Sequence, residues 1–444
     1  MLFAASPLTT LALAAAAIVM TVTVRGLPEL ERRRLLIILA IALVARFAFI
    51  AAVMISGIPF LNDLSVGALQ GDDAYYLARA IRARDILLGL TTGRYDFFIV
   101  SDEYGRTSYL QVLTVLQTLF GPSPYGLRAL NAVLFVAGAG LLFRLARPAF
   151  GATAAVTGLT ALLFLPSLFV SSTSLLKEST YFFITTLLLT LVVAALRHPR
   201  LIARVVAVAA AIVCLWLLDD LRRGALLLSI AGIVTALVMY VVFATPRRAL
   251  AALAVAVVVA MAAWAQPAIH TRAIDGITAA AKTHAGHVFT IGHDYKLLDE
   301  GFYMHPGTPA AWALELSDAQ AARFLIRAGR SFLFTPWPWE IVSASELAFL
   351  PEHIIWLLIV IFTPIGIVAG ARRDRLITVL LIGFVLPMAA ALAVTNGNVG
   401  TLLRLRGLVS PYLILVAAVG LLSVAEYLLS RRTAMAPQAA EALR

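Results

Sequence analysis

The stretch LQTLFGPSPYGLRALNAVLFVAGAGLLFRLARPAFG, residues 116–151, decides the fold of this chain. It contains the end of one apolar run, 107–120, and the whole of a second, 125–146. A helix needs about 20 apolar residues to cross the hydrocarbon layer of a membrane, so the first run is too short and the second is long enough. We therefore predict an interfacial or re-entrant helix over 107–120, followed directly by a membrane-spanning helix.

The composition of the whole chain agrees with this prediction. Of its 444 residues, 61% are hydrophobic and 13% are charged, and the mean hydropathy is +0.93. This excludes a soluble globular domain and predicts an all-α polytopic membrane protein. The net charge of +11 does not indicate nucleic acid, because the basic residues alternate with apolar spans. The single cysteine, Cys214, excludes an intramolecular disulfide.

About eleven apolar runs are long enough to be transmembrane helices. They lie near 8–24, 35–55, 125–146, 151–169, 175–196, 203–218, 224–244, 249–266, 352–370, 376–394 and 408–429. The first run has no convincing cleavage site after it, and we expect it to be a retained anchor.

Every second connection between these runs is basic, which indicates the cytoplasmic side of a membrane. The N-terminus is then expected outside and the C-terminus in the cytoplasm. The basic residues are Arg25, Arg32, Arg33, Arg34, Arg144, Arg147, Arg197, Arg200, Arg204, Arg247, Arg248, Arg372, Arg373, Arg375, Arg431 and Arg432.

The orientation divides the chain into three parts. Residues 1–266 form an N-terminal transmembrane module, whose first external loop, 56–124, carries an acidic pair. Residues 267–351 form a long external loop, and 352–444 hold the C-terminal transmembrane helices. In the long loop, 317–334 is expected to be an interfacial helix with a Ser317–Gln320 capping box. Its arginines follow helical spacing and are expected to contact lipid headgroups; they are Arg323, Arg327 and Arg330.

The acidic pair is Asp72 and Asp73, in the sequence GDDAYYLARA, 71–80. One aspartate would serve as a helix cap, because a carboxylate accepts from the free N–H groups of a first turn. The second could be solvated in an external loop. A carboxylate at the outer membrane face is equally well placed to act as a general base on an incoming hydroxyl or amine. The residues alone leave these alternatives open.

An acidic pair followed by an aromatic residue in the first external loop resembles the GT-C superfamily of integral-membrane glycosyltransferases. The segment 116–151 is similar to the pattern in bacterial relatives of protein O-mannosyltransferases and aminoarabinose transferases. In that pattern an interfacial helix ends in Phe-Gly, an arginine (here Arg128) opens the next span, and a second Phe-Gly (here Phe150–Gly151) closes it after an Arg-rich turn. The resemblance covers about the first 200 residues well.

The resemblance implies transfer of a sugar from a polyprenyl-phosphate-linked donor to an acceptor at the external face of the bacterial cytoplasmic membrane. Asp72 would be the base, and Asp73 a helper or a metal-facing partner. Some members of the superfamily use a divalent cation such as Mg²⁺ or Mn²⁺ at the acidic pair and others do not, so a cofactor stays undecided. The sugar and the acceptor, whether glycan, lipid or protein, stay undecided as well.

A lipid phosphate requires cations near the outer boundary, and arginine suits it because the guanidinium can bind two oxygens at once. Cations at the external ends of spans oppose the positive-inside bias, which makes them functional candidates. These candidates are Lys177, Arg222, Arg223, Arg404 and Arg406. The alternative is ion pairing, of Lys177 with Glu178 and of Arg222 or Arg223 with Asp219 or Asp220.

The long external loop offers further candidates. We interpret His270, His284, His287, His293 and His305 as solvated residues and not as metal ligands, because their spacings are loose. Trp337 and Trp339 are typical of interfacial anchors. Either could also border an acceptor groove, since aromatic rings stack on sugar faces. The second-rank acid candidates are Glu340, Glu346 and Glu352.

We therefore predict an inverting membrane glycosyltransferase, in which the base deprotonates the acceptor and arginines stabilise the departing phosphate. One alternative is a glycan polymerase or ligase that uses polyprenyl-diphosphate-linked oligosaccharides. Another is a lipid or glycan transporter, which predicts ionisable residues within spans and helices broken by Gly or Pro. Most charges here fall at the ends of spans, which favours the enzyme.

Overall fold

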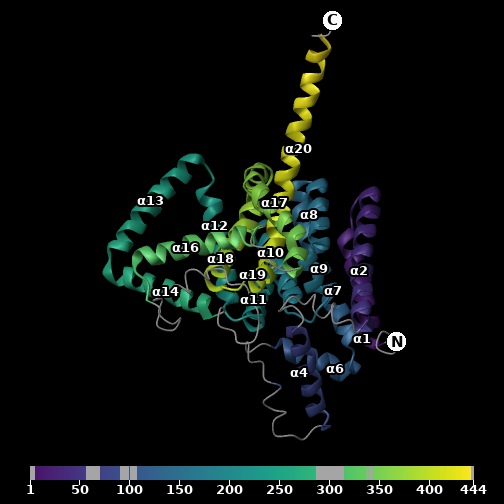
Figure 1. Ribbon diagram of the computed structural model, residues 1–444. Helices are drawn as coiled ribbons and strands as arrows, with labels where there is room; N and C mark the ends of the chain where they lie inside the picture. Colours follow the sequence, from purple (N-terminus) through teal and green to yellow (C-terminus); the bar gives the residue numbers. More distant parts are fainter. Residues whose placement is uncertain are drawn as a thin grey trace.

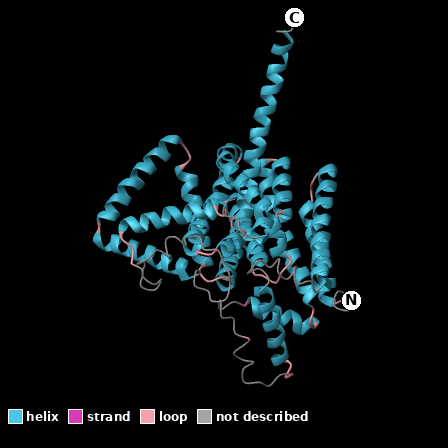
Figure 2. Cartoon of the chain, in the orientation of Figure 1, coloured by secondary structure: helices cyan, strands magenta, loops and turns pink. Residues whose placement is uncertain are grey.

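The computed structural model describes residues 6–56, 71–90, 100, 108–286, 315–337, 339 and 344–441. All of its described elements are α-helices (Figures 1 and 2). They are α1 (Pro7–Val24), α2 (Glu29–Ser56), α4 (Gly71–Leu87), α6 (Tyr109–Phe120), α7 (Pro124–Phe150), α8 (Ala152–Phe164), α9 (Pro166–Ser172), α10 (Glu178–Arg197), α11 (Leu201–Leu221), α12 (Ala225–Val242), α13 (Pro246–Ala265), α14 (Pro267–Gly286), α16 (Asp318–Phe334), α17 (Ala344–Arg373), α18 (Arg375–Thr395), α19 (Val399–Arg406) and α20 (Ser410–Glu441).

The described part contains ten helices that are long and apolar enough to cross a membrane, or eleven if α8 and α9 count as one span. The chain is therefore an all-α polytopic membrane protein, as predicted. The apolar run predicted near 151–169 forms α8 and α9, with a bend of 63° between them. The cause is Pro166, which has no N–H and forces the preceding Leu165 into an extended conformation.

The segment 116–151 folds as its sequence predicts. α6 is a short apolar helix and α7 a full span, and a Phe-Gly pair ends each of them. Gly121 and Gly151 have φ of 78° and 92° with extended ψ, a conformation that only glycine adopts without strain. Ser123 caps α7 by accepting the N–H of Gly126, and Pro124 occupies the first turn.

The basic connections meet at one end of the bundle. Arg144 donates to the carbonyl of Arg25 at 2.9 Å, and Arg197 forms a two-pronged ion pair with Asp374 at 2.7 Å. Arg373 donates to the carbonyl of Phe150 at 2.9 Å. These contacts confirm that the alternate connections lie together. The side of the membrane that they face stays a prediction.

α20 packs against α8 and α17, and α18 packs against α12, so helices from both ends of the sequence share one bundle (Figure 1). The division into 1–266, 267–351 and 352–444 stays a prediction.

α16 runs across the direction of the spanning helices (Figure 1). Its predicted capping box between Ser317 and Gln320 is confirmed. An open hollow of about 580 Å³ follows its outer face, lined by Ala319, Ala322, Arg323, Ile326, Arg327 and Arg330.

Candidate active site

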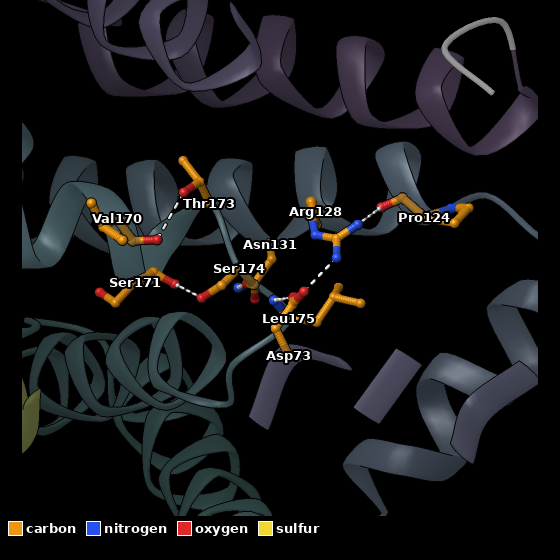
Figure 3. Close-up of polar contacts among 9 residues, drawn as sticks. All are labelled: Asp73, Pro124, Arg128, Asn131, Val170, Ser171, Thr173, Ser174 and Leu175. Atoms are coloured by element: carbon orange, nitrogen blue, oxygen red, sulfur yellow. Dashed lines mark hydrogen bonds and ion pairs between the residues drawn. The ribbon is translucent and has the colours of Figure 1, made fainter. Parts of the chain in front are cut away.

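The candidate site forms around residues 173–177, which connect α9 to α10. α10 runs from Glu178 to the basic end at Arg197, so this turn lies at the opposite end of the bundle. Ser171 and Ser174 brace the turn through a 2.8 Å hydrogen bond (Figure 3). Its backbone groups point toward side chains from α4, α6 and α7. The turn is therefore the point where helices distant in sequence meet.

Asp73 is 7% exposed and both of its carboxylate oxygens are engaged. One oxygen pairs with the Arg128 guanidinium from α7, and the other accepts the N–H of Leu175 (Figure 3). Asp73 thus ties α4 to α7 and to the turn. It is buried and its two oxygens bind partners outside α4, so it is not the solvated residue that one interpretation expected.

Asp72 lies beside Asp73 in the first turn of α4. Its side chain is outside the described part of the structure, so its role as the base stays a prediction.

Two residues that the sequence analysis did not select complete the support of the turn. Asn131 donates from its amide nitrogen to the carbonyls of Ser174, at 2.5 Å, and Leu176, at 3.3 Å. The Tyr109 hydroxyl also donates to the Leu176 carbonyl at 3.3 Å. Burial raises the pKa of Tyr109 well above its usual value, so the phenol stays neutral. The signal for Asn131 was a single amide in an apolar span.

Three of the predicted charged residues come together at the end of the turn. Arg404 on α19 lies 3.8 Å from the Glu178 carboxylate, and both side chains are half-buried. The ammonium of Lys177 lies 5.4 Å from the centre of the Tyr76 ring. We call Asp73, Arg128, Lys177, Glu178 and Arg404 the site cluster. Among the described residues the Glu178 carboxylate faces Arg404, and no ion pair joins it to Lys177, the pairing considered from the sequence.

Arg406 points away from the site cluster although it is two residues from Arg404. It is buried and donates to the carbonyls of Ser331 and Thr335, at 3.1 and 2.7 Å. Its guanidinium lies 5.0 Å from the Trp356 ring centre. Burial lowers the pKa of Arg406 to about 9, so it remains a cation at neutral pH. Arg406 thereby holds the end of α16.

The other predicted cations lie at the turn between α11 and α12. Arg222 is half-buried and Arg223 is exposed. Among the described residues no ion pair joins either of them to Asp219 or Asp220. Asp220 instead accepts the backbone N–H of Ser108 at 2.9 Å, which connects α11 to the start of α6.

The aromatic candidates form a stack at the end of α16. The ring centres of Phe334 and Trp337 are 5.6 Å apart, and those of Trp337 and Trp339 are 4.8 Å apart. Both pairs are nearly parallel, and the outer ring, Trp339, is exposed. The interpretation of His284 as solvated is wrong, because its side chain is buried in α14 with its ring 5.5 Å from that of Phe324. Four other candidates lie outside the described residues: Glu340, His287, His293 and His305.

Both oxygens of Asp73 accept hydrogen bonds, from Arg128 and from the Leu175 N–H, and a divalent cation at the acidic pair stays a prediction. Across the part of the chain that the structure describes, no three His, Cys, Asp or Glu side chains gather in a way that could hold a metal ion. A cation bound through Asp72 stays a prediction.

Comparison with known proteins gives structural likenesses only. No family model matches the chain, and no curated protein matches it. Two structures of ArnT from Cupriavidus metallidurans are similar to it. The apo structure has a TM-score of 0.44 and 17% identity over 78% of this chain. The structure bound to undecaprenyl phosphate has a TM-score of 0.47 and 18% identity over 87%. The chain spans 54% and 59% of the two ArnT chains, and no residue-by-residue correspondence follows.

Proposed function

We propose that the protein is a membrane glycosyltransferase that moves a sugar from a polyprenyl-phosphate-linked donor to an acceptor at the external face. The observation that supports this best is the site cluster. Besides the Asp73–Arg128 pair at the acidic start of α4, it holds two further cations, Lys177 and Arg404, at the end of the bundle opposite the basic connections. A reaction that releases a lipid phosphate requires this combination of a base and cations.

In the proposed mechanism Asp72 takes the proton of the acceptor hydroxyl, whose oxygen then attacks the anomeric carbon of the sugar. The bond to the phosphate oxygen breaks, and the configuration at the sugar inverts. Asp73 is less suited to be the base, since both of its oxygens already accept hydrogen bonds, from Arg128 and from the Leu175 N–H. Its proposed task is to fix the first turn of α4, and with it the backbone of Asp72.

Arg404 and Lys177 are proposed to neutralise the phosphate that leaves with the lipid. Negative charge grows on that phosphate in the transition state, so cations fixed in advance accelerate the step. Glu178 holds the Arg404 guanidinium near the turn before the donor arrives. We assign Arg406 the supporting task of holding α16, because its guanidinium already serves two carbonyl oxygens.

The test is native mass spectrometry of the detergent-purified protein with added polyprenyl phosphate. Arg404→Ala is expected to lose most of the bound lipid, and Arg248→Ala, a matched change of an exposed arginine at the basic end, to retain it. Lipid retention by Arg406→Ala shows whether Arg406 binds the phosphate directly or, as we propose, only supports α16. Failure of the wild type to bind any polyprenyl species would contradict the proposal.

Turnover with a panel of polyprenyl-phosphate sugars tests the base. Asp72→Asn is expected to lower kcat by about 10²–10⁴-fold while lipid retention is unchanged. A glycan polymerase or ligase that uses polyprenyl diphosphates would be served by the same cations. It would be favoured if the diphosphate lipid bound better and Asp72→Asn kept its activity.

Transport is the second candidate, because one observation favours it. Arg46 is buried within the span α2, next to the break between α8 and α9. Ionisable residues and broken helices inside a membrane are typical of transporters. Movement of a labelled polyprenyl phosphate across proteoliposomes, without any glycosyl transfer, would favour this function over the enzyme.

A further inference from the structure

Two charged side chains, the buried Arg46 and the half-buried Glu352, complete the hydrogen bonding of the break between α8 and α9. In a continuous helix the N–H of Ser167 would bond to the carbonyl of Leu163, four residues earlier. The break separates these two groups. Arg46 donates to the Leu163 carbonyl at 2.8 Å, and the Glu352 carboxylate accepts the Ser167 N–H at 2.8 Å. Each side chain therefore replaces one half of the missing backbone bond.

Arg46 also joins the two halves of the broken helix to each other. Its Nε donates to the Ser172 hydroxyl at 2.8 Å, so one guanidinium contacts both α8 and the last residue of α9. The rings of Phe135 and Phe169 lie 5.1 and 4.7 Å from it. Arg46 is 0% exposed. Burying an arginine within a span costs free energy, so such residues are rare and usually have a functional role.

The break determines where the candidate site lies. α9 ends at Ser172, and the next residues form the turn that contacts Asp73 and Asn131. The 63° bend directs α9 toward that turn. Glu352 is also close enough to Arg406 to attract it electrostatically, and Arg406 belongs to the short helix that carries Arg404. The break is thus connected to both sides of the site cluster.

We propose that Arg46 and Glu352 are positioning residues, which hold the break between α8 and α9 in its bent form and thereby fix the turn 173–177. The role of the turn in catalysis rests on the proposed function, whereas the hydrogen bonds of the break are independent of it. Neither residue acts on the substrate, so both differ from the base and the phosphate ligands.

The test measures exposure of the turn directly. Thr173 is buried, and Thr173→Cys in a Cys214→Ser background places a single thiol there. Glu352→Leu leaves the Ser167 N–H without its acceptor, and we expect thiol labelling about tenfold faster. Glu352→Gln keeps an oxygen acceptor and is expected to label within about twofold of the parent. Turnover should be reduced in Glu352→Leu and restored in Glu352→Gln.

Two outcomes would overturn the proposal. The first is equal labelling of Glu352→Leu and the parent. The second is a Glu352→Gln variant whose thiol at position 173 is labelled as fast as in Glu352→Leu. The charge of Glu352 would then matter, and the acceptor oxygen would not. If Glu352→Leu does not fold, Ser172→Ala removes one Arg46 contact and should still raise labelling about threefold. No change in Ser172→Ala would overturn the proposal as well.

The labelling requires no substrate, so the two proposals can fail separately. A wild type that binds no polyprenyl lipid would contradict the proposed function and leave the labelling result valid. A chain that binds the lipid normally but labels equally in all variants would contradict the positioning role alone.

Discussion

α7 and α13 are both apolar helices long enough to cross a membrane, yet they occupy opposite environments. In the most apolar segment of α7, 72% of the residues are buried, whereas the corresponding value for α13 is 0%. α7 packs against α1, α2, α8 and α10, and α13 stands at the edge of the molecule (Figure 1). Apolar length therefore determines which helices cross the membrane and says little about where they lie in the bundle.

Two features of α7 explain its central place. Small residues such as Gly138 allow close approach, since a Cβ there would lie 2.9 Å from the Phe182 ring. Polar side chains, Arg128 and Asn131, bond to α4 and to the turn 173–177. α13 has alanines but no polar side chain between 249 and 263. Interhelical hydrogen bonds in the absence of water favour the position of α7.

The largest expected effect comes from Arg128→Ala on α7. It leaves the Asp73 carboxylate buried without its cation, and breaking a buried pair in this way costs about 3–5 kcal/mol. Equilibrium unfolding in mixed micelles measures the loss. The matched change on α13, Arg248→Ala, removes an exposed charge and should stay within about 0.5 kcal/mol.

The double variant Asp73→Asn/Arg128→Met sharpens this prediction. It removes both charges, so it should recover most of the stability that Arg128→Ala loses. If Arg128→Ala costs no more than Arg248→Ala, the proposed difference between the two helices is wrong.

Close packing gives the next largest effect. Gly138→Leu places atoms against the Phe182 ring and the Phe183 backbone, and overpacking of this kind costs about 1–3 kcal/mol. The control on α13 is Ala256→Leu, where the side chain is exposed and no cost is expected. Thermal unfolding of both variants in the same detergent compares them. Equal midpoints would show that α7 tolerates added volume as α13 does.

The sequence predicts the spans well because apolar length and basic connections are local properties. The Phe-Gly pairs also predict helix ends, since the required backbone conformation belongs to glycine. The site is predicted only in part. Asp73, Lys177 and Arg404 were selected by type and place, but their partners depend on how α4, α10 and α19 meet. Arg46 is a lone charge in an apolar run, a pattern that indicates a functional or structural role within the membrane and that was not used above.

A smaller effect is expected from Asn131→Leu. The Leu176 carbonyl keeps the Tyr109 hydroxyl as a donor, so the main loss is the bond to Ser174. One lost hydrogen bond of this kind corresponds to about 1–1.5 kcal/mol. Asn131→Asp has the same shape and cannot donate when ionised, so it should lose at least as much. A stable aspartate variant in unfolding experiments would contradict the donor role of Asn131.

The smallest effect should come from the His270–Asp318 contact, which joins α14 to α16 beside α13. The imidazole Nε2 lies 2.9 Å from a carboxylate oxygen, but the side chains are 31% and 57% exposed. Exposed pairs contribute at most about 1 kcal/mol and are screened by salt. A double-mutant cycle with His270→Gln and Asp318→Asn, at low and high salt, measures the coupling. A coupling above about 1 kcal/mol that persists in salt would mean that α14 and α16 are joined as firmly as α7 is to its neighbours. Weak association with neighbours would then be a property of α13 alone and would not extend to α14 and α16 beside it.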